Sequence, residues 1–209
     1  MGIFDEIAAY GVVPVIAIDD AAAALPLADA LTEGGLPVAE ITFRTGAARA
    51  AIAAIADHRP AMLVGAGTVL DTDQVDAAVD AGARFALAPG LDAEVLARAA
   101  ARALPFAPGI QTASELSRAL RGGCEMVKFF PAAQAGGPAA LAALAGPFAH
   151  TGIGFNPTGG VTLQTMGDWL ALAMVRAVGG TWIATREQIA AGDWEGIAQR
   201  ARDAVARAQ

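Results

Sequence analysis

The stretch VAEITFRTGAARAAIAAIADHRPAMLVGAGTV, residues 38–69, contains the pattern that decides the fold. A short apolar run, 38–44, leads into an alanine-rich segment, and a second apolar run, 61–69, follows. Short runs rich in β-branched residues predict buried strands, and the segment between them predicts a helix. The order strand, helix, strand predicts two parallel strands joined by a crossover helix.

The same unit recurs along the whole chain. Helical stretches such as DAEVLARAAARA, 92–103, separate the runs and open with Asp, Thr or Ser as candidate caps. This alternation predicts a (β/α)8 TIM barrel, a single domain over residues 1–209 with a short N-terminal helix. A doubly wound open sheet is the main alternative, but it usually has fewer strands. The runs are VVPVIAI (12–18), VAEITFR (38–44), AMLVGAGTV (61–69), RFALAPG (84–90), PFAPGI (105–110), EMVKFFPA (125–132), TGIGFNPTGG (151–160) and MVRAVGGTW (174–182).

Composition excludes several classes of protein. Of 209 residues, 55% are apolar, and the net charge of -7 argues against a nucleic-acid partner. The apolar window from Phe129 to Gly167 is broken by Gly, Pro, Asn and Gln, so we expect no transmembrane helix and no membrane partner. The first residues lack the pattern of a secretion signal, and a single cysteine, Cys124, fits a reducing compartment. We therefore expect a cytoplasmic protein.

Lys128 stands out because it lies inside the apolar run EMVKFFPA, 125–132. If its side chain faces the interior, desolvation disfavours the charged ammonium. A neutral amine is a nucleophile toward carbonyl groups and forms a Schiff base. The alternative is a lysine that reaches solvent or pairs with an acid at a strand edge, and the chemistry of the lysine alone does not decide between the two.

The second run supports an active site. In EITFRT, the residues Glu40, Thr42 and Arg44 alternate, so their side chains share one face of the strand. A strand buried on both faces is normally almost entirely apolar, so these residues predict a polar cavity. Glu40 beside Lys128 could act as general acid and base, and Arg44 could bind a carboxylate. The alternative is a structural Glu40–Lys128 ion pair with Arg44 in solvent.

Two pairs of glycines end the last two runs, in PTGG (157–160) and VGGT (178–181). Paired glycines expose backbone N–H groups, and the loops after the last two strands of such barrels often bind phosphate. The chain contains neither a GxGxxG nor a GxxxxGK[ST] motif, which counts against nucleotide chemistry. The two histidines, His58 and His150, lie far apart in the sequence, and no metal-binding motif is present. We expect no metal and no cofactor.

Several of these motifs together resemble one known family. VAEITFRT, VGAGTV, PGIQTASE, VKFFPA, PTGGV and VGGTW are similar to the signature of the bacterial 2-keto-3-deoxy-6-phosphogluconate (KDPG) aldolases. The resemblance implies a metal-independent class I aldolase, built as a homotrimer of (β/α)8 barrels. Such an enzyme cleaves KDPG to pyruvate and glyceraldehyde 3-phosphate through a lysine Schiff base. Family members often also cleave 4-hydroxy-2-oxoglutarate, to pyruvate and glyoxylate.

The resemblance assigns a role to individual residues. Lys128 takes the position of the Schiff-base lysine, and Glu40 that of the general acid and base. The positions that would hold the pyruvate carboxylate are Arg44 and Thr68, and the walls of the pyruvyl pocket would be Pro89 and Phe130. The residues at the hydroxyl and phosphate end of the keto-acid phosphate substrate would be Thr158, Gly159, Gly160, Gly180 and Thr181.

The chain departs from the family pattern at four positions. Ala133 and Ala135 stand where many relatives have an acid and an asparagine, Gln111 stands where relatives usually have a small residue, and Thr181 replaces a serine. The departures bear on phosphate affinity and substrate range and leave the imine chemistry untouched. The related 2-keto-3-deoxy-6-phosphogalactonate aldolases lack the strand pattern of TFRT, so the sequence favours the gluconate branch.

Other functions remain open from the residues alone. A phosphosugar isomerase or epimerase would use Glu40 as its base, with Lys128 as electrostatic support. A non-catalytic sugar-phosphate-binding barrel would need no buried lysine and no inward Glu40–Arg44 pair. A metal-dependent aldolase would need ligand clusters that the sequence lacks.

Overall fold

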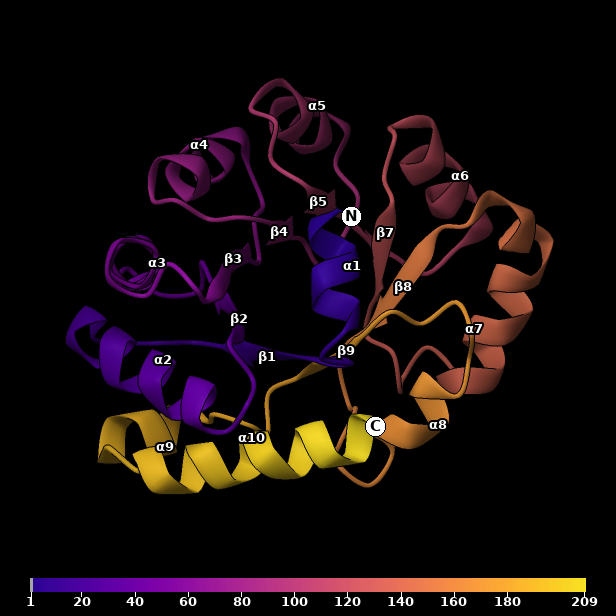
Figure 1. The fold of residues 1–209 in the computed structure, drawn as a ribbon. Coiled ribbons are helices and arrows are strands. Elements are labelled where there is room, and N and C mark those ends of the chain that lie inside the picture. The colour runs from indigo at the N-terminus through magenta and orange to yellow at the C-terminus, as the bar shows by residue number, and fades with distance from the viewer. Residues whose placement is uncertain (1) are drawn as a thin grey trace.

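The computed structural model describes residues 2–209 of the chain. Parallel strands form the interior and helices surround them (Figure 1). The strands begin at one end of the molecule, where the helix α1 (Ile3–Ala8) lies across them. None of the helices in residues 2–209 combines the length and the hydropathy of a membrane span.

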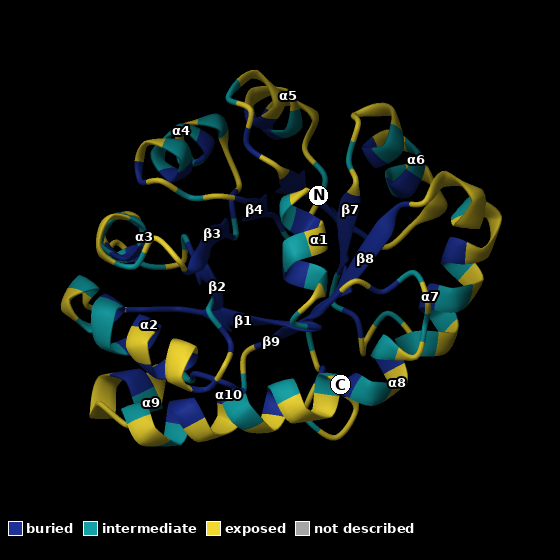
Figure 2. Cartoon of the chain, viewed as in Figure 1, coloured by how far each residue is buried: buried dark blue, intermediate teal, exposed yellow. Residues whose placement is uncertain are grey.

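The helices arise where the sequence places caps and alanine-rich segments. Thr112 forms a reciprocal capping box with Glu115 at the start of α6, and Asp71 and Asp92 accept backbone N–H groups at the starts of α4 and α5. The helices bury one face, made of branched side chains and some of their alanines, and expose most of their charged residues (Figure 2). Their bounds are α2 (Ala24–Glu33), α3 (Ala48–His58), α4 (Thr72–Asp80), α5 (Ala93–Ala101), α6 (Ala113–Arg121), α7 (Gly137–Ala145), α8 (Met166–Leu170), α9 (Arg186–Ala191) and α10 (Trp194–Ala208), with short 3-10 helices η1 (Ala21–Ala23) and η2 (Gly146–Thr151).

Each apolar run of the sequence contains a strand, and the fifth run contains two. All residues of these strands are buried, which agrees with strands that are covered by helices on one face and by other strands' side chains on the other. The strands are β1 (Val12–Ile16), β2 (Val38–Thr42), β3 (Leu63–Gly67), β4 (Ala86–Leu87), β5 (Phe106–Ala107), β6 (Gly109–Ile110), β7 (Met126–Phe129), β8 (Gly154–Pro157) and β9 (Val178–Gly180).

The prediction of a closed (β/α)8 TIM barrel is wrong. Hydrogen-bonded ladders divide the strands into a six-stranded sheet, in the order β5-β4-β3-β2-β1-β9, and a three-stranded sheet, in the order β6-β7-β8. Isolated bridges, Phe155 with Val175 and Thr158 with Gly179, link the two sheets at β8. The short N-terminal helix of the same prediction is present as α1.

The physical reason lies in the fifth run, PFAPGI. Pro108 has no N–H group to donate to a ladder, and it separates β5 from β6. As a result β5 pairs with β4, and β6 pairs with β7, so each half of the run belongs to a different sheet. At the other junction, β9 is only three residues long and pairs with β1.

Candidate active site

Lys128 and Glu40 meet in the interior of the molecule. Lys128 lies on β7 and Glu40 on β2, and the lysine Nζ donates a hydrogen bond to Glu40 Oε1 at 2.9 Å. Glu40 is fully buried and Lys128 is 5% exposed. Burial disfavours the charge of each side chain, and their mutual attraction offsets that cost. The Nζ atom also lies 5.8 Å from the centre of the Phe130 ring, a cation–π distance.

Glycines on neighbouring strands make room for this pair. Glu40 lies beside Gly65 in the parallel register, and Lys128 lies beside Gly109. A Cβ atom on Gly67 would come within 2.2 Å of Glu40 Oε1, so no residue with a side chain fits there without moving the carboxylate. The chain therefore leaves space for Glu40 by omitting a side chain at Gly67.

The second oxygen of Glu40 has no partner in the protein. Oε2 is buried, and no atom of the described residues hydrogen-bonds to it. A buried carboxylate oxygen without a partner costs free energy, which favours a ligand or a proton at this atom. The pair thus offers an amine and, next to it, a proton acceptor.

Thr42 and Arg44 contact each other, although β2 ends at Thr42 and Arg44 lies in the turn that follows. Thr42 Oγ1 donates to the carbonyl of Ile16 on β1 at 2.8 Å, and Arg44 Nε donates to Thr42 Oγ1 at 3.0 Å. Arg44 is exposed, and the part of the chain that the structure describes gives it no carboxylate partner. Its guanidinium is accordingly available for an anion.

A cavity of about 300 Å³ brings Arg44 and Thr181 together at the ends of β1, β2 and β9. Arg186 also lines it and forms a two-pronged ion pair with Asp19, with a distance of 3.0 Å from Nε to Oδ2. Arg186 is thus already paired, and Glu187 adds a negative charge to the lining, so Arg44 is the guanidinium that can bind an anion here, beside the hydroxyls of Thr181 and Thr185. The lining residues are Val15, Ala17, Arg44, Thr181, Ala184, Thr185, Arg186 and Glu187.

The PTGG loop packs against the segment after β7. Gly159 and Gly160 have φ of 96° and 74°, in the left-handed region that favours glycine. A Cβ atom on Gly160 would lie 2.5 Å from the Cβ of Ala133, and one on Gly159 would lie 3.1 Å from the Cα of Pro131. The close approach holds this loop next to Phe130, on the same side of the molecule as Lys128.

Thr68 and Pro89 lie just beyond β3 and β4, at the same ends of their strands as Arg44. Thr68 has φ of 55°, an uncommon conformation for a threonine. The structure records no hydrogen bond between either side chain and Lys128 or Glu40 within residues 2–209. Gln111, one of the departures from the family pattern, donates from Nε2 to the carbonyl of Phe130 at 2.9 Å and so contacts the rim of the site.

Asn156 is a polar residue of the interior that the sequence pattern did not single out. It is fully buried on β8, and its Cα lies directly beside that of Lys128 in the β7–β8 register. Its side chain hydrogen-bonds to Thr158 Oγ1 and to the carbonyl of Ala177. The sequence clue to Asn156 was a polar amide inside the mostly apolar run TGIGFNPTGG. The carboxylate of Glu40 inside its own apolar run is a clue of the same kind.

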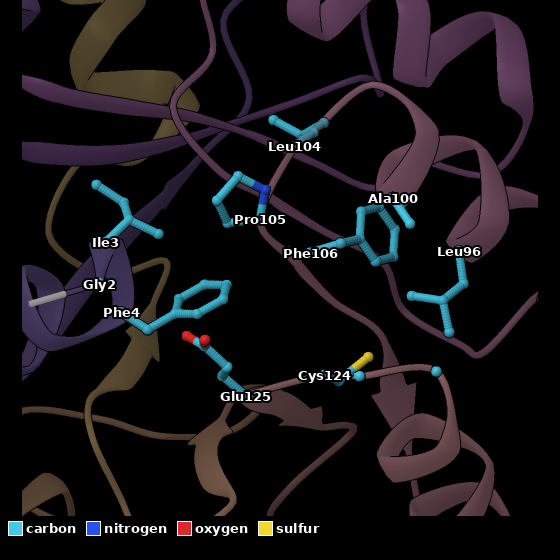
Figure 3. Close-up of a pocket in the computed structure, with 12 residues that line it drawn as sticks. Gly2, Ile3, Phe4, Leu96, Ala100, Leu104, Pro105, Phe106, Cys124 and Glu125 are labelled. Carbon is cyan, nitrogen blue, oxygen red and sulfur yellow. The ribbon is translucent and has the colours of Figure 1, made fainter.

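A second hollow lies at the opposite end of the strands, near α1. Its volume is about 310 Å³, and Phe4, Phe106, Cys124 and Glu125 are among its lining residues, whereas Lys128 and Glu40 are not (Figure 3). Burial raises the pKa of the Cys124 thiol to about 11, so the reactive thiolate is suppressed. These features favour a structural cysteine over a nucleophile.

Neither histidine lies beside Lys128 or Glu40. His58 is exposed at the end of α3, and His150 is exposed in η2. Within residues 2–209, no three His, Cys, Asp or Glu side chains gather as a metal-binding group.

Known proteins resemble the chain over nearly its whole length. Residues 3–200 match the family model described as KDPG and KHG aldolase. A 2-dehydro-3-deoxy-phosphogluconate aldolase of Pseudomonas aeruginosa is 45% identical over 94% of this chain and 88% of its own. A KHG/KDPG aldolase of Escherichia coli is 44% identical over 93% and 90%. A KDPG aldolase of Legionella pneumophila, crystallised with pyruvate captured as a covalent carbinolamine, superposes with a TM-score of 0.90 at 40% identity, covering 95% of this chain and 96% of that one.

Proposed function

The chain belongs to the family of KDPG and KHG aldolases, and from this premise we propose that it cleaves KDPG to pyruvate and glyceraldehyde 3-phosphate through a Schiff base on Lys128. The observation that carries the proposal is the buried contact of 2.9 Å between Lys128 Nζ and Glu40 Oε1. It places a nucleophilic amine and a proton acceptor side by side in the interior. Such a pair meets the two requirements of a class I aldolase without a metal.

The proposed reaction uses the pair twice. The Lys128 amine, after giving a proton to Glu40, attacks the C2 carbonyl of the substrate. Glu40 returns that proton to the carbinolamine oxygen, which leaves as water, and a protonated imine and an ionised Glu40 remain. Glu40 then takes the proton of the C4 hydroxyl, the bond between C3 and C4 breaks, and its electrons move to the imine to form an enamine. The aldehyde leaves, the enamine regains a proton at C3 from Glu40, and hydrolysis releases pyruvate and the free lysine.

The remaining residues bind the two ends of the substrate. Arg44, with Thr68, holds the pyruvyl carboxylate, since the guanidinium of Arg44 has no carboxylate partner in the described chain. Pro89 and Phe130 form walls of the pyruvyl pocket. The distal end of the substrate lies against the glycine turns and Thr181, where backbone N–H groups can donate to phosphate. The residues of this end are Thr158, Gly159, Gly160, Gly180 and Thr181.

Reduction with borohydride in the presence of pyruvate tests the proposal. We expect mass spectrometry of the peptides to find a reduced pyruvyl adduct on Lys128 in the wild type and none in Lys128→Ala or Lys128→Arg. Cleavage of KDPG should be lost in both variants, because an arginine keeps the charge but cannot form the imine. A Lys128→Arg variant with substantial turnover would contradict the Schiff-base role and would favour an isomerase that uses Glu40 as its base.

The names of the family and of the E. coli relative also include KHG, so 4-hydroxy-2-oxoglutarate is a second substrate to assay. The proposed enzyme is a cytoplasmic homotrimer whose residues 1–209 form one domain. Light scattering on the purified protein tests the trimer: a mass near three times 21.0 kDa supports it, and a monomer contradicts it.

A further inference from the structure

Gln134 carries the one polar side chain of the turn that follows β7. The segment PAAQAGG, 131–137, otherwise consists of proline, alanine and glycine. Gln134 is exposed, and within residues 2–209 the structure records no hydrogen bond to its side-chain amide. Both the NH₂ group and the oxygen of this amide are therefore open to a ligand.

Backbone hydrogen bonds hold this turn beside the PTGG loop. The amide of Ala132 donates to the carbonyl of Thr158 at 2.8 Å, and the amide of Ala133 donates to the carbonyl of Gly159 at 3.0 Å. The two bonds continue the pairing of β7 with β8 beyond the ends of both strands. The backbone that leads to Gln134 is thus fixed, and its side chain is the part that can adjust to a ligand.

The amide of Gln134 lies next to Gly160. A Cβ atom on Gly160 would be 3.5 Å from Gln134 Nε2 and 3.6 Å from Gln134 Oε1. In the proposed function, Gly160 is one of the residues at the phosphate end of the substrate. A phosphate that binds at the backbone of Gly160 is therefore within reach of the glutamine amide.

The two loops around this amide offer a phosphate no charged side chain. From Phe129 to Gly167 the chain contains no Asp, Glu, Lys or Arg. Ala133 stands where many relatives have an acid, so the turn also lacks a carboxylate that would repel an anion. From these loops a phosphate can gain only neutral donors, and the amide of Gln134 supplies two N–H groups.

We infer that Gln134 is a specificity-determining residue that donates a hydrogen bond from Nε2 to the phosphate of the substrate. The inference rests on the proposed function, which supplies the substrate and the place of its phosphate. Phosphate oxygens are strong acceptors, so the contact uses Nε2 and not Oε1. The amide adds affinity for phosphorylated substrates and takes no part in the imine chemistry at Lys128.

Two other roles for Gln134 make different predictions. If the amide only covered Gly160 and stiffened the turn, its loss would slow every reaction at Lys128, including reactions of compounds without a phosphate. If the side chain were only solvated, its loss would change no reaction. Reactions with and without a phosphate therefore separate the three roles.

The experiment compares cleavage of KDPG with the exchange of the methyl hydrogens of pyruvate for deuterium in D₂O, followed by NMR. The exchange needs the imine and proton transfer but involves no phosphate. We expect Gln134→Leu to raise KM for KDPG about tenfold, the loss of one hydrogen bond to a charged group, with kcat and pyruvate exchange near wild type. Gln134→Glu keeps the shape of the side chain, but its carboxylate repels the phosphate, so KM should rise further than in Gln134→Leu.

Gln199→Leu is the matched control, because Gln199 is an exposed glutamine on the outer helix α10, and both readouts should stay near wild type. An unchanged KM for KDPG in Gln134→Leu would overturn the inference, as would equal losses of KDPG cleavage and pyruvate exchange. A KM in Gln134→Glu no higher than in Gln134→Leu would also overturn it. The wild type distinguishes the two levels: without KDPG cleavage and pyruvate exchange the proposed function fails, whereas an active wild type with an unaltered Gln134→Leu removes only the role of Gln134.

Discussion

The two carboxylate oxygens of Glu40 have different surroundings. Oε1 accepts from Lys128, and Oε2 is buried without a partner in the described chain. Glu40→Gln keeps the shape of the side chain and removes its capacity to accept a proton. We expect kcat for KDPG cleavage to fall by about 10²- to 10⁴-fold, the usual contribution of a general base. Steady-state turnover assays measure it, and borohydride should still trap some pyruvate on Lys128; an unchanged kcat would remove Glu40 from proton transfer.

Gly67 offers a test of how tightly the carboxylate is held. Gly67→Ala would place a Cβ atom 2.2 Å from Glu40 Oε1, so the glutamate must move. We expect the free energy of unfolding to fall by about 1–3 kcal/mol, the typical cost of overpacking, and activity to fall with it. Urea unfolding and KDPG turnover measure the two effects.

Gly146→Ala is the matched control for Gly67→Ala. Gly146 begins η2 with φ of -48°, and no atom lies within 4 Å of the position that a Cβ atom would take there, so an alanine fits. The control should leave both stability and turnover near wild type. If Gly67→Ala behaved like Gly146→Ala, the packing around Glu40 would be looser than the contact distance implies.

At the scale of residues, the sequence predicted a carboxylate beside the buried lysine, and Glu40 lies within hydrogen-bond distance of Lys128. The alternation of Glu40, Thr42 and Arg44 predicted a shared face. Arg44 hydrogen-bonds to Thr42, but it lies in the turn after β2 and not on the strand. The alternation could not reveal that Arg44 is exposed while Glu40 is fully buried, because that depends on where β2 ends relative to its neighbours. Asn156 was missed because its importance depends on the carbonyl of Ala177, a partner far away in sequence.

Between elements, charged residues join α4 to α5. Asp76 on α4 pairs with Arg98 on α5 and with Arg102 just after it, and Arg102 also pairs with Asp80 at 2.7 Å. The hydrogen bond from Arg98, together with the charges of both arginines, holds the pKa of Asp76 below its ordinary value of 3.8. A network of this kind contributes more than an isolated surface pair does.

The sign of the pH dependence follows from that lowered pKa. The ionised Asp76 is favoured in the folded state, so its stabilisation is complete above the unfolded pKa and is lost as the pH falls through the lower folded pKa. We expect Asp76→Asn to lower Tm at pH 7, and the difference from wild type to shrink as the pH is lowered from about 5 towards 2. Thermal unfolding followed by circular dichroism over this range measures it.

Asp57→Asn on the exposed face of α3 is the control for Asp76, since the structure records no ion pair for Asp57 in residues 2–209. Its Tm should follow the wild type at every pH. A constant difference between Asp76→Asn and wild type down to pH 2 would mean that Asp76 acts through its shape and not through its charge.

The element pattern was readable from the sequence, whereas the pairing of the strands was not. Caps at Asp92 and Thr112 predicted where α5 and α6 begin, because a side-chain acceptor is needed there. Apolar runs give no information on which backbone groups bond to which neighbour. The break at Pro108 therefore altered the architecture of the sheets without altering the order of the elements.

At the scale of the whole molecule, the division into two sheets predicts that local unfolding begins at the junction between them. The amide of Phe155 donates to the carbonyl of Met174 at 2.9 Å, and the amide of Arg176 donates to the carbonyl of Phe155 at 3.0 Å, and both bonds cross the junction near β8. The amide of Ala66, on β3 within the six-stranded sheet, donates to the carbonyl of Phe85 at 2.9 Å. The bond lengths are alike, so a difference in protection must come from the surrounding ladders.

We expect the amide hydrogens of Phe155 and Arg176 to exchange with solvent faster than that of Ala66. An isolated bridge opens without breaking a ladder, whereas the Ala66 amide is released only when β3 separates from β4. Ala66 also lies beside Ile41 in register, so β3 is held to β2 as well. Native-state hydrogen exchange by NMR at low urea measures the opening free energies. Asn156→Leu removes the bond to Ala177 and should speed exchange at Phe155 and Arg176 while leaving Ala66 unaffected. Equal protection of all three amides would mean that the two sheets open as one cooperative unit, despite the absence of a continuous ladder between them in the described chain.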